Sequence, residues 1–231
     1  IVKRLSKIQI DGVLVAPSSE TKNFDHFRRL QKSGIPVVVF DRDCPGLEAD
    51  KVLVDDYFGA FQAVEYLIGT GCKNIAHLGG PLNLSTTEQR LQGYLDALEK
   101  NKVPINRDYL VHVPGFAHKE AVKATKQLME LQEHPDAIFA YNDKIAISAM
   151  HIVKKMGLKI PDEVSVLGFD DEPHSSFITP ALSTVWQPVY SMGMLSARIL
   201  LSHLNNKNNI LEFRKEVFKP ELVIRASSKE K

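Results

Sequence analysis

Two adjacent carboxylates, Asp170 and Asp171, end the segment VSVLGFDD at residues 164–171. The short apolar run before them is typical of a strand that is covered on both faces of a parallel sheet. In open α/β sheets ligands bind at the carboxyl ends of strands, because loops and helix N-termini converge there. Either carboxylate could instead only cap the next turn, and position alone leaves both interpretations open.

Polar or aromatic residues stand at the ends of nearly all the other predicted strands or in the segments that follow them. They are Ser18, Asp41, Asp55, Asp56, Arg90, Asn142 and Gln187, with Phe116 as the aromatic member. Carboxylates, amides and a guanidinium can bond to hydroxyl groups, while an aromatic ring covers an apolar face. The set therefore predicts binding of a polyhydroxylated small molecule.

Catalytic and metal-binding patterns are weak in comparison. The chain has no GxSxG motif, and its two cysteines, Cys44 and Cys72, show neither CxxC spacing nor a paired histidine. His77 precedes a Gly-Gly turn and is predicted to be a buried structural histidine. Neighbouring residues on a strand point to opposite faces, which argues against magnesium at Asp170 and Asp171. We expect no enzyme activity and no cofactor.

The composition is that of a globular protein. The 231 residues are 44% hydrophobic and 25% charged, and the net charge of +1 gives no broad basic surface for nucleic acid or an anionic membrane. Two isolated cysteines favour a reducing compartment, so we expect a cytoplasmic protein. No apolar run has the roughly 18 residues of a membrane span, and no signal peptide opens the chain. Because Ile1 is not a natural start, we expect upstream residues.

Strand-like and helix-like segments alternate along the chain, which predicts an α/β fold with parallel sheets. Predicted strands lie at 13–16, 36–40, 52–54, 75–78, 110–113, 137–141, 164–167, 211–218 and 222–225. Helical periodicity marks the intervening segments, including residues 1–8 and 191–204, and no internal repeat is present.

These motifs together resemble the effector-binding core of the LacI/GalR transcription regulators, which is related to periplasmic sugar-binding proteins. The similar segments include IDGVLVAP, GIPVVVFDR, RLQGYLDAL, AIFAYNDKIAISAM and, most specifically, IPDEVSVLGFDD followed by LSTVWQP. The resemblance implies two doubly wound parallel-sheet lobes joined by three crossings, a type I periplasmic-binding-protein-like fold. It predicts one lobe from residues 1–54 and 189–218, and a second from residues 55–188 and 219–231.

The family motifs imply an effector, often a sugar or a purine, bound in the cleft by residues already singled out above. The predicted contacts are Asp41, Arg90, Phe116, Asn142 and Asp170, to which the strand-end pattern adds Gln187. We expect alanine at Arg90 or Asp170 to weaken binding and leave the fold intact. Many members have an amide where this chain has Asp56, which leaves the role of that acid open.

The resemblance also implies a homodimer. Ile147 stands apart from the core stripe of its helix, and Phe177 and Ile178 lie in a polar loop, so a partner would explain all three. The family's helix-turn-helix, hinge helix and first strands precede the matched part, so DNA contact is expected only through a headpiece outside this chain. A missing strand placed between the 13–16 strand and its neighbour would leave unpaired sheet edges.

The leading hypothesis is therefore the effector-binding core of a LacI-type DNA-binding regulator, in which ligand-driven lobe closure controls DNA affinity. A periplasmic sugar-binding receptor of a transporter is the alternative, because it uses the same kind of cleft. A sugar-modifying enzyme is the third interpretation, and the sequence shows no activated nucleophile or acid–base pair for it.

Overall fold

The computed structural model describes residues 10–205 and 212–230, so the helix predicted at 1–8 and the start of the strand predicted at 211–218 lie outside the described residues. The chain forms two compact units. Unit 1 comprises Ile1–Asp55, Asn83–Ser85 and Pro188–Phe218. Unit 2 comprises Asp56–Leu82, Thr86–Gln187 and Lys219–Lys231. Among the described residues, every helix is too short or too polar to cross a bilayer.

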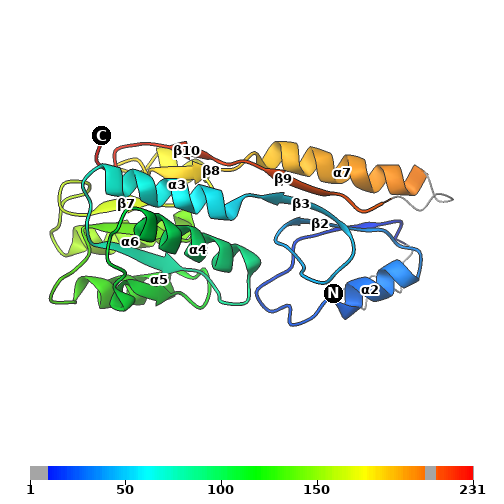
Figure 1. Ribbon diagram of the computed structural model, residues 1–231, viewed down its shortest axis with the longest axis horizontal. Coiled ribbons are helices and arrows are strands. Elements are labelled where there is room, and N and C mark those ends of the chain that lie inside the picture. Colours follow the sequence, from blue (N-terminus) through cyan, green and yellow to red (C-terminus); the bar gives the residue numbers. More distant parts are fainter. Residues whose placement is uncertain (1–9, 206–211, 231) are drawn as a thin grey trace. The chain divides into compact units, whose positions relative to one another are not determined.

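Unit 1 is built on a parallel sheet of four strands in the order β1-β2-β3-β9. These strands are β1 (Val13–Val15), β2 (Val37–Asp41), β3 (Asp50–Val54) and β9 (Lys215–Phe218). Helices α2 (Asp25–Lys32) and α7 (Val189–Asn205) lie on opposite sides of this sheet (Figure 1). The unit is therefore doubly wound, as the family resemblance implies.

Alternation along β2 explains how this sheet supports both helices. Val37 and Val39 are buried against Phe27 and Leu30 of α2. The intervening Val38 is buried on the other face, in a second cluster that includes residues of α7. Successive side chains of a strand point to opposite faces, so one apolar run supplies both layers of the core.

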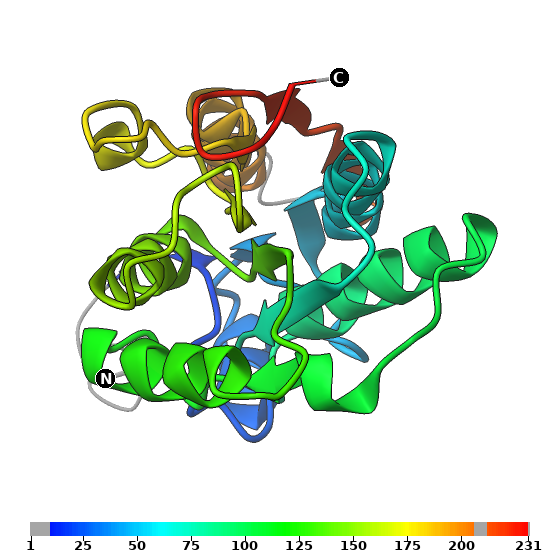
Figure 2. The same ribbon diagram turned by 90° about the vertical axis from the view of Figure 1, so that its left-hand side faces the viewer.

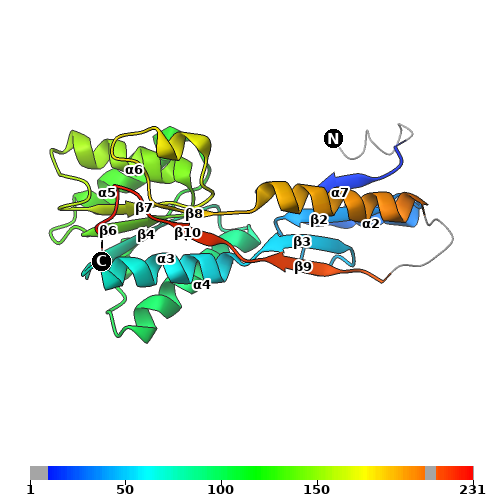
Figure 3. The same ribbon diagram turned by 90° about the horizontal axis from the view of Figure 1, so that it is seen from above.

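The expected gap beside the 13–16 strand is wrong. β1 pairs directly with β2 in parallel register, with Val13 opposite Val37 and Val15 opposite Val39, so no strand position is empty between them (Figure 3). β1 is instead the end strand of the described sheet, and Leu14 on it is 39% exposed. The predicted unpaired edges between these two strands therefore do not exist.

Unit 2 contains a second parallel sheet, in the order β5-β4-β6-β7. Its strands are β5 (Leu110–His112), β4 (Ile75–Gly79), β6 (Ala137–Ala140) and β7 (Ser165–Leu167). Its helices are α3 (Asp56–Gly69), α4 (Ser85–Lys100), α5 (His118–Met129) and α6 (Asp143–Lys155). β8 (Thr184–Trp186) and β10 (Glu221–Val223) form an antiparallel ribbon, and two 3-10 turns, η1 (Arg107–Tyr109) and η2 (Pro173–Ser176), complete the unit.

The four helices of unit 2 cover both faces of this sheet. Figure 2 shows α5 and α6 on one side of the strands and α3 and α4 on the other. Ala63 of α3 and Tyr94 of α4 share a buried cluster with Phe139 and Leu167 from the strands. The sheet is therefore buried on both faces, and its strands all deliver their carboxyl ends to one edge.

His77 on β4 is a structural residue, as predicted. The residue is 1% exposed, and its ring stacks on those of Tyr94 and Phe139, with ring centroids 5.3 and 5.2 Å away. Its Nδ1 lies 3.0 Å from the carbonyl oxygen of Phe139. Burial lowers the pKa of His77 to about 4, so the imidazole is neutral at pH 7.

Candidate functional site

The centre of the candidate site is a buried ion pair between two helices of unit 2. Arg90 of α4 and Asp56, the first residue of α3, are each 3% exposed. The Nε of Arg90 donates to Oδ1 of Asp56 over 2.7 Å. Asp56 also lies at the N-terminus of α3, where the helix dipole favours a negative charge. The acid whose role the sequence leaves open thus holds the arginine in place.

The remaining contacts of Arg90 connect it to the ends of β6 and β7. Its NH1 donates to the backbone oxygen of Tyr141 over 2.5 Å and lies 3.6 Å from Oδ1 of Asp170. Its Cζ is 3.6 Å from the ring centre of Phe169 and 4.6 Å from that of Tyr141, within the range of cation–π attraction. The guanidinium is therefore fixed by charge, hydrogen bonding and ring contacts at once.

Burial opposes the charge on Arg90, but the carboxylates of Asp56 and Asp170 outweigh that effect. The pKa of Arg90 is accordingly raised above its ordinary value. A guanidinium is protonated in proteins even without such help, so Arg90 carries a fixed positive charge.

The two adjacent carboxylates at the end of the 164–171 segment separate toward different partners. Oδ1 of Asp170 accepts from Nε2 of Gln187 over 2.7 Å, whereas Oδ1 of Asp171 pairs with NH1 of Arg225 over 2.8 Å. Both residues have a positive φ, +114° for Asp170 and +53° for Asp171. A non-glycine residue in such a conformation costs about 1–3 kcal/mol and often marks a functional site.

Asn142 has a structural role in addition to the predicted one. It is the N-cap of α6, where its Oδ1 accepts from the backbone N–H of Ile145 over 3.0 Å. The residue is 7% exposed. The cap uses only the amide oxygen, so Nδ2 is the group that could donate to a ligand.

Tyr141 joins the aromatic part of the site to the rest. Its ring stacks on that of Phe116, with centroids 5.7 Å apart and an interplanar angle of 24°. Its hydroxyl lies 2.7 Å from Oγ1 of Thr86. Phe116 is thus placed beside the residue whose carbonyl binds Arg90.

The structure brings five of the six predicted contacts into unit 2. Arg90, Asp170 and Gln187 form one connected network, and Phe116 and Asn142 adjoin it through Tyr141. Asp41 belongs to unit 1, where it ends β2 with a φ of +66° and lies 3.5 Å from Nε of Arg42.

The sequence alone gives no definite role to Asp56, Tyr141, Phe169 or Thr86. Asp56 is visible there as part of a strand-end acid pair, and Tyr141 directly precedes Asn142. Phe169 and Thr86 carry no signal that distinguishes them from ordinary core residues.

A further buried carboxylate, Asp143, ties the loop after Asp171 to α6. It is 0% exposed, and its Oδ2 accepts from Ser175 and from the backbone N–H of Glu172, while its Oδ1 accepts from Thr184. Burial raises the pKa of Asp143 to about 6, against the effect of these hydrogen bonds. The loop that leaves the candidate site is therefore anchored by a buried acid.

The residues predicted for a dimer interface lie on that loop and on α6. Phe177 is 84% exposed, and Ile147 and Ile178 are half-buried. Nζ of Lys154 on α6 donates to the backbone oxygen of Thr179, so the loop lies against this helix. These side chains consequently belong to one region of unit 2.

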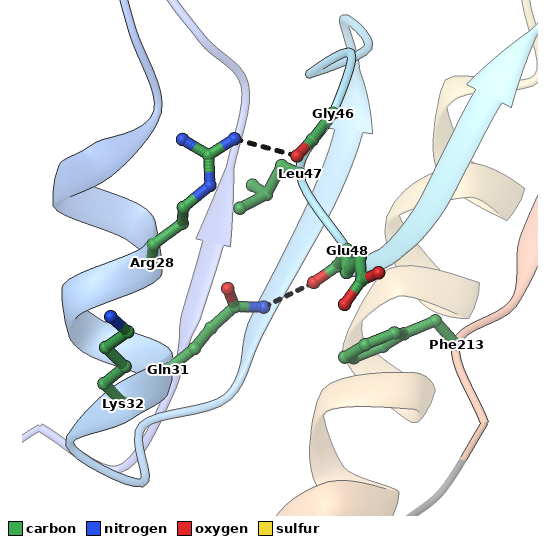
Figure 4. Close-up of a pocket in the computed structure, with 7 residues that line it drawn as sticks. All are labelled: Arg28, Gln31, Lys32, Gly46, Leu47, Glu48 and Phe213. Atoms are coloured by element: carbon green, nitrogen blue, oxygen red, sulfur yellow. Dashed lines mark hydrogen bonds between the residues drawn. The ribbon is translucent and has the colours of Figure 1, made fainter.

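An open pocket of about 450 Å³ lies elsewhere, on unit 1 (Figure 4). Two polar side chains that line it already form hydrogen bonds within the protein. Arg28 donates to the carbonyl of Gly46 over 2.8 Å, and Gln31 donates to that of Glu48 over 2.7 Å. None of the predicted effector residues lines it. In the part of the chain that the structure describes, no cluster of three or more histidine, cysteine, aspartate or glutamate side chains could hold a metal ion.

Comparison with known proteins identifies the family of this chain. Residues 64–228 match the family model described as a periplasmic binding protein-like domain. The chain is 35% identical to the "Probable HTH-type transcriptional repressor ExuR" of Bacillus subtilis (strain 168), over 86% of this chain and 59% of that protein. It is 32% identical to the "HTH-type transcriptional repressor PurR" of Vibrio parahaemolyticus, over 99% of this chain and 67% of that protein.

A solved structure of a transcriptional regulator has a similar fold. The structure of the "transcriptional regulator CelR-cellobiose complex" superposes with a TM-score of 0.89 at 27% identity, and the match covers 98% of this chain and 68% of that one. The chain spans about 59% of the ExuR repressor. The family model and the named repressors both match most of this chain, which therefore belongs to the LacI/GalR family, of which it is the effector-binding core.

Proposed function

We propose that this chain binds a polyhydroxylated small molecule, a sugar or a related compound, and that binding controls a DNA-binding regulator of which the chain is part. The observation that carries the proposal is the buried Arg90 beside Asp170, whose carboxylate is oriented by Gln187. A hydroxyl group can accept from the guanidinium and donate to the carboxylate at the same time. Phe116, Asn142 and, from the family motif, Asp41 complete the proposed contacts.

The similar proteins support this function over a transporter receptor. The curated relatives carry the names of transcriptional repressors, and one structural neighbour, CelR, is named as a complex with cellobiose. We infer that the chain acts without catalysis, in the cytoplasm, and that DNA is contacted by a headpiece outside this chain. An effector can control DNA affinity only if it binds one arrangement of the protein more tightly than the other.

A ligand screen tests the proposed site. Sugars, nucleosides and sugar phosphates are compared by thermal shift, since a ligand at 100 times its Kd adds about 2.7 kcal/mol of stability. Asp170→Asn should weaken binding of any hit by about 1.5–3 kcal/mol, because a charged hydrogen bond is lost.

Asp171→Asn is the matched control for this screen. Its carboxylate is adjacent in sequence but pairs with Arg225, so the affinity should stay close to that of the wild type. Equal affinities in Asp170→Asn and the wild type, measured by calorimetry on the same hit, would contradict the assignment of Asp170.

We also propose that the chain forms a homodimer through Ile147, Phe177 and Ile178. An exposed aromatic side chain next to half-buried aliphatic ones suits the apolar centre of an interface. Phe177→Ser removes the most exposed of these side chains and should convert a dimer at tens of micromolar into monomers, as measured by sedimentation velocity.

Leu82→Ser supplies the control, because Leu82 is also strongly exposed, at 72%, but is not one of the three proposed interface residues. That variant should sediment like the wild type. A wild type that is monomeric at this concentration, or a Phe177→Ser variant that stays dimeric, would show that the interface lies elsewhere or does not exist.

A further inference from the structure

We propose that Thr184 is a positioning residue for effector binding, and that its hydroxyl fixes the turn that presents the carboxylate of Asp170. The inference rests on the proposed function, since Asp170 is one of the proposed effector contacts. It goes further because Thr184 is 0% exposed and is not one of the residues predicted to contact an effector. Thr184 would therefore act without touching the ligand.

The turn that Thr184 would hold has an unfavourable backbone conformation. Asp170 and Asp171 follow one another with φ of +114° and +53°, a region that residues other than glycine rarely adopt. Such a conformation persists only where the surrounding structure determines it. The direction of the Asp170 side chain depends on this turn, because a relaxed backbone would point its Cα–Cβ bond elsewhere.

Three successive backbone N–H groups of the turn at residues 170–172 have defined acceptors. The first donates to the carbonyl oxygen of Val185 over 2.9 Å. The second donates to Oγ1 of Thr184 over 3.3 Å, and the third donates to Oδ2 of Asp143 over 2.8 Å. The turn is thus held at each of its residues, and the middle acceptor is a hydroxyl that one substitution can remove.

The hydroxyl of Thr184 connects this turn to a buried charge. It donates its proton to Oδ1 of Asp143 over 2.6 Å, and Asp143 is 0% exposed. Burial raises the pKa of Asp143 to about 6, which still leaves the acid ionised at pH 7.5. A hydrogen bond to an ionised acceptor is short and strong, so the proton of Thr184 is committed to the acid. The hydroxyl oxygen consequently keeps its lone pairs for the N–H of Asp171.

A movement of the turn would reach the proposed effector contacts directly. The carboxylate of Asp170 lies 3.6 Å from NH1 of Arg90 and accepts from Nε2 of Gln187 over 2.7 Å. A sugar hydroxyl that bonds to both the guanidinium and the carboxylate needs the two groups in this arrangement. The apparent affinity therefore falls by the fraction of molecules that keep the arrangement.

Thr184→Val tests the inference, because valine keeps the branched shape of threonine and lacks only the hydroxyl. Calorimetry at pH 7.5 compares the variant with the wild type on glucose, galactose, ribose and cellobiose. For the sugar that the wild type binds most tightly, the Kd should rise about tenfold or more, because fewer molecules hold the turn in the binding conformation. The stoichiometry should stay unchanged, whereas partial unfolding would lower it. Thr184→Ser restores the hydroxyl and should restore the Kd of the wild type.

Ser175→Ala is the matched control. Ser175 is also 0% exposed and also donates its hydroxyl proton to Asp143 over 2.6 Å, but the N–H groups of the turn donate to other acceptors. Both variants thus take one donor from the same buried acid, and only Thr184→Val also releases the turn. Ser175→Ala should lose stability in urea to an extent similar to Thr184→Val, and its Kd for the sugar should stay that of the wild type.

The possible results separate the inference from the proposed function. A Thr184→Val variant with the Kd of the wild type overturns the inference, as does a loss of affinity that Thr184→Ser fails to restore. An equal loss in Ser175→Ala overturns it too, because the buried acid would then control affinity without the turn. A wild type that binds none of the four sugars contradicts the proposed sugar binding itself, and the inference falls with it.

Discussion

Replacing Arg90 by alanine is expected to lower the free energy of unfolding by about 3–5 kcal/mol, because it leaves a buried carboxylate without its counterion. Asp56 is 3% exposed and lies 2.7 Å from the guanidinium. Once the guanidinium is removed, water cannot readily solvate the carboxylate that remains. The ring contacts of Arg90 with Phe169 and Tyr141 are lost at the same time. Urea unfolding of the purified variant measures the effect.

The structure therefore argues against the expectation that alanine at Arg90 leaves the fold intact. A loss of ligand binding in that variant would mix a weakened fold with a missing contact. Asp170 is the better position for a binding test, since its side chain is 28% exposed and its ion-pair distance to Arg90 is longer, at 3.6 Å.

A double-mutant cycle separates the ion pair from the other contacts of Arg90. Asp56→Ala combined with Arg90→Ala removes both charges, so the double variant should be more stable than the sum of the two single losses predicts. A coupling energy of about 1–3 kcal/mol is expected for two groups in direct contact. Additive losses, or an Arg90→Ala variant within about 1 kcal/mol of the wild type, would show that the pair contributes little.

Much of the fold follows from local patterns in the sequence. Apolar runs such as Val37 to Val39 are buried on both faces, and their alternation with helical segments predicts the parallel sheets that are observed. α7 begins at Val189, two residues before the predicted start at 191, directly after Pro188. Apolar periodicity marks only the buried face of a helix, whereas a preceding proline helps to set its first turn.

The candidate site could be predicted only in part, for a physical reason. Strand-end position identifies Arg90 and Asp170 because parallel strands deliver their ends to one edge. The partnership of Arg90 with Asp56 joins residues 34 positions apart, and an acid at a helix start is equally well explained by the helix dipole. Which of two adjacent acids faces the arginine depends on the backbone turn at Asp170 and Asp171, which no side-chain pattern encodes.

Asp143 is another residue whose contacts cannot be predicted from the sequence. In the sequence it is an ordinary acid in the first turn of a helix. In the structure it is fully buried and accepts hydrogen bonds from Ser175, Thr184 and the backbone of Glu172. Such a network needs three separate segments to meet, so it appears only when the tertiary fold is known.

Gly93→Ala is expected to destabilise the protein by about 3 kcal/mol, the upper part of the range for overpacking a core. A Cβ at this position in α4 would lie 2.4 Å from the carbonyl oxygen of Tyr57 and 2.9 Å from the backbone nitrogen of Phe61, both in α3. Backbone atoms cannot rotate away as a side chain can, so the two helices must separate. Because α3 carries Asp56 and α4 carries Arg90, their separation should also disturb the buried ion pair.

Gly193→Ala is the matched control, since Gly193 is also a helical glycine but a Cβ there would meet nothing within 4 Å. That variant should gain about 0.5–1 kcal/mol, because alanine loses less backbone entropy than glycine when a helix forms. Chemical denaturation of both variants gives the two changes on one scale. If close helix packing explains Gly93, the stability changes of Gly93→Ala and Gly193→Ala must have opposite signs. A stabilising Gly93→Ala would mean that α3 and α4 do not approach as closely as the structure places them.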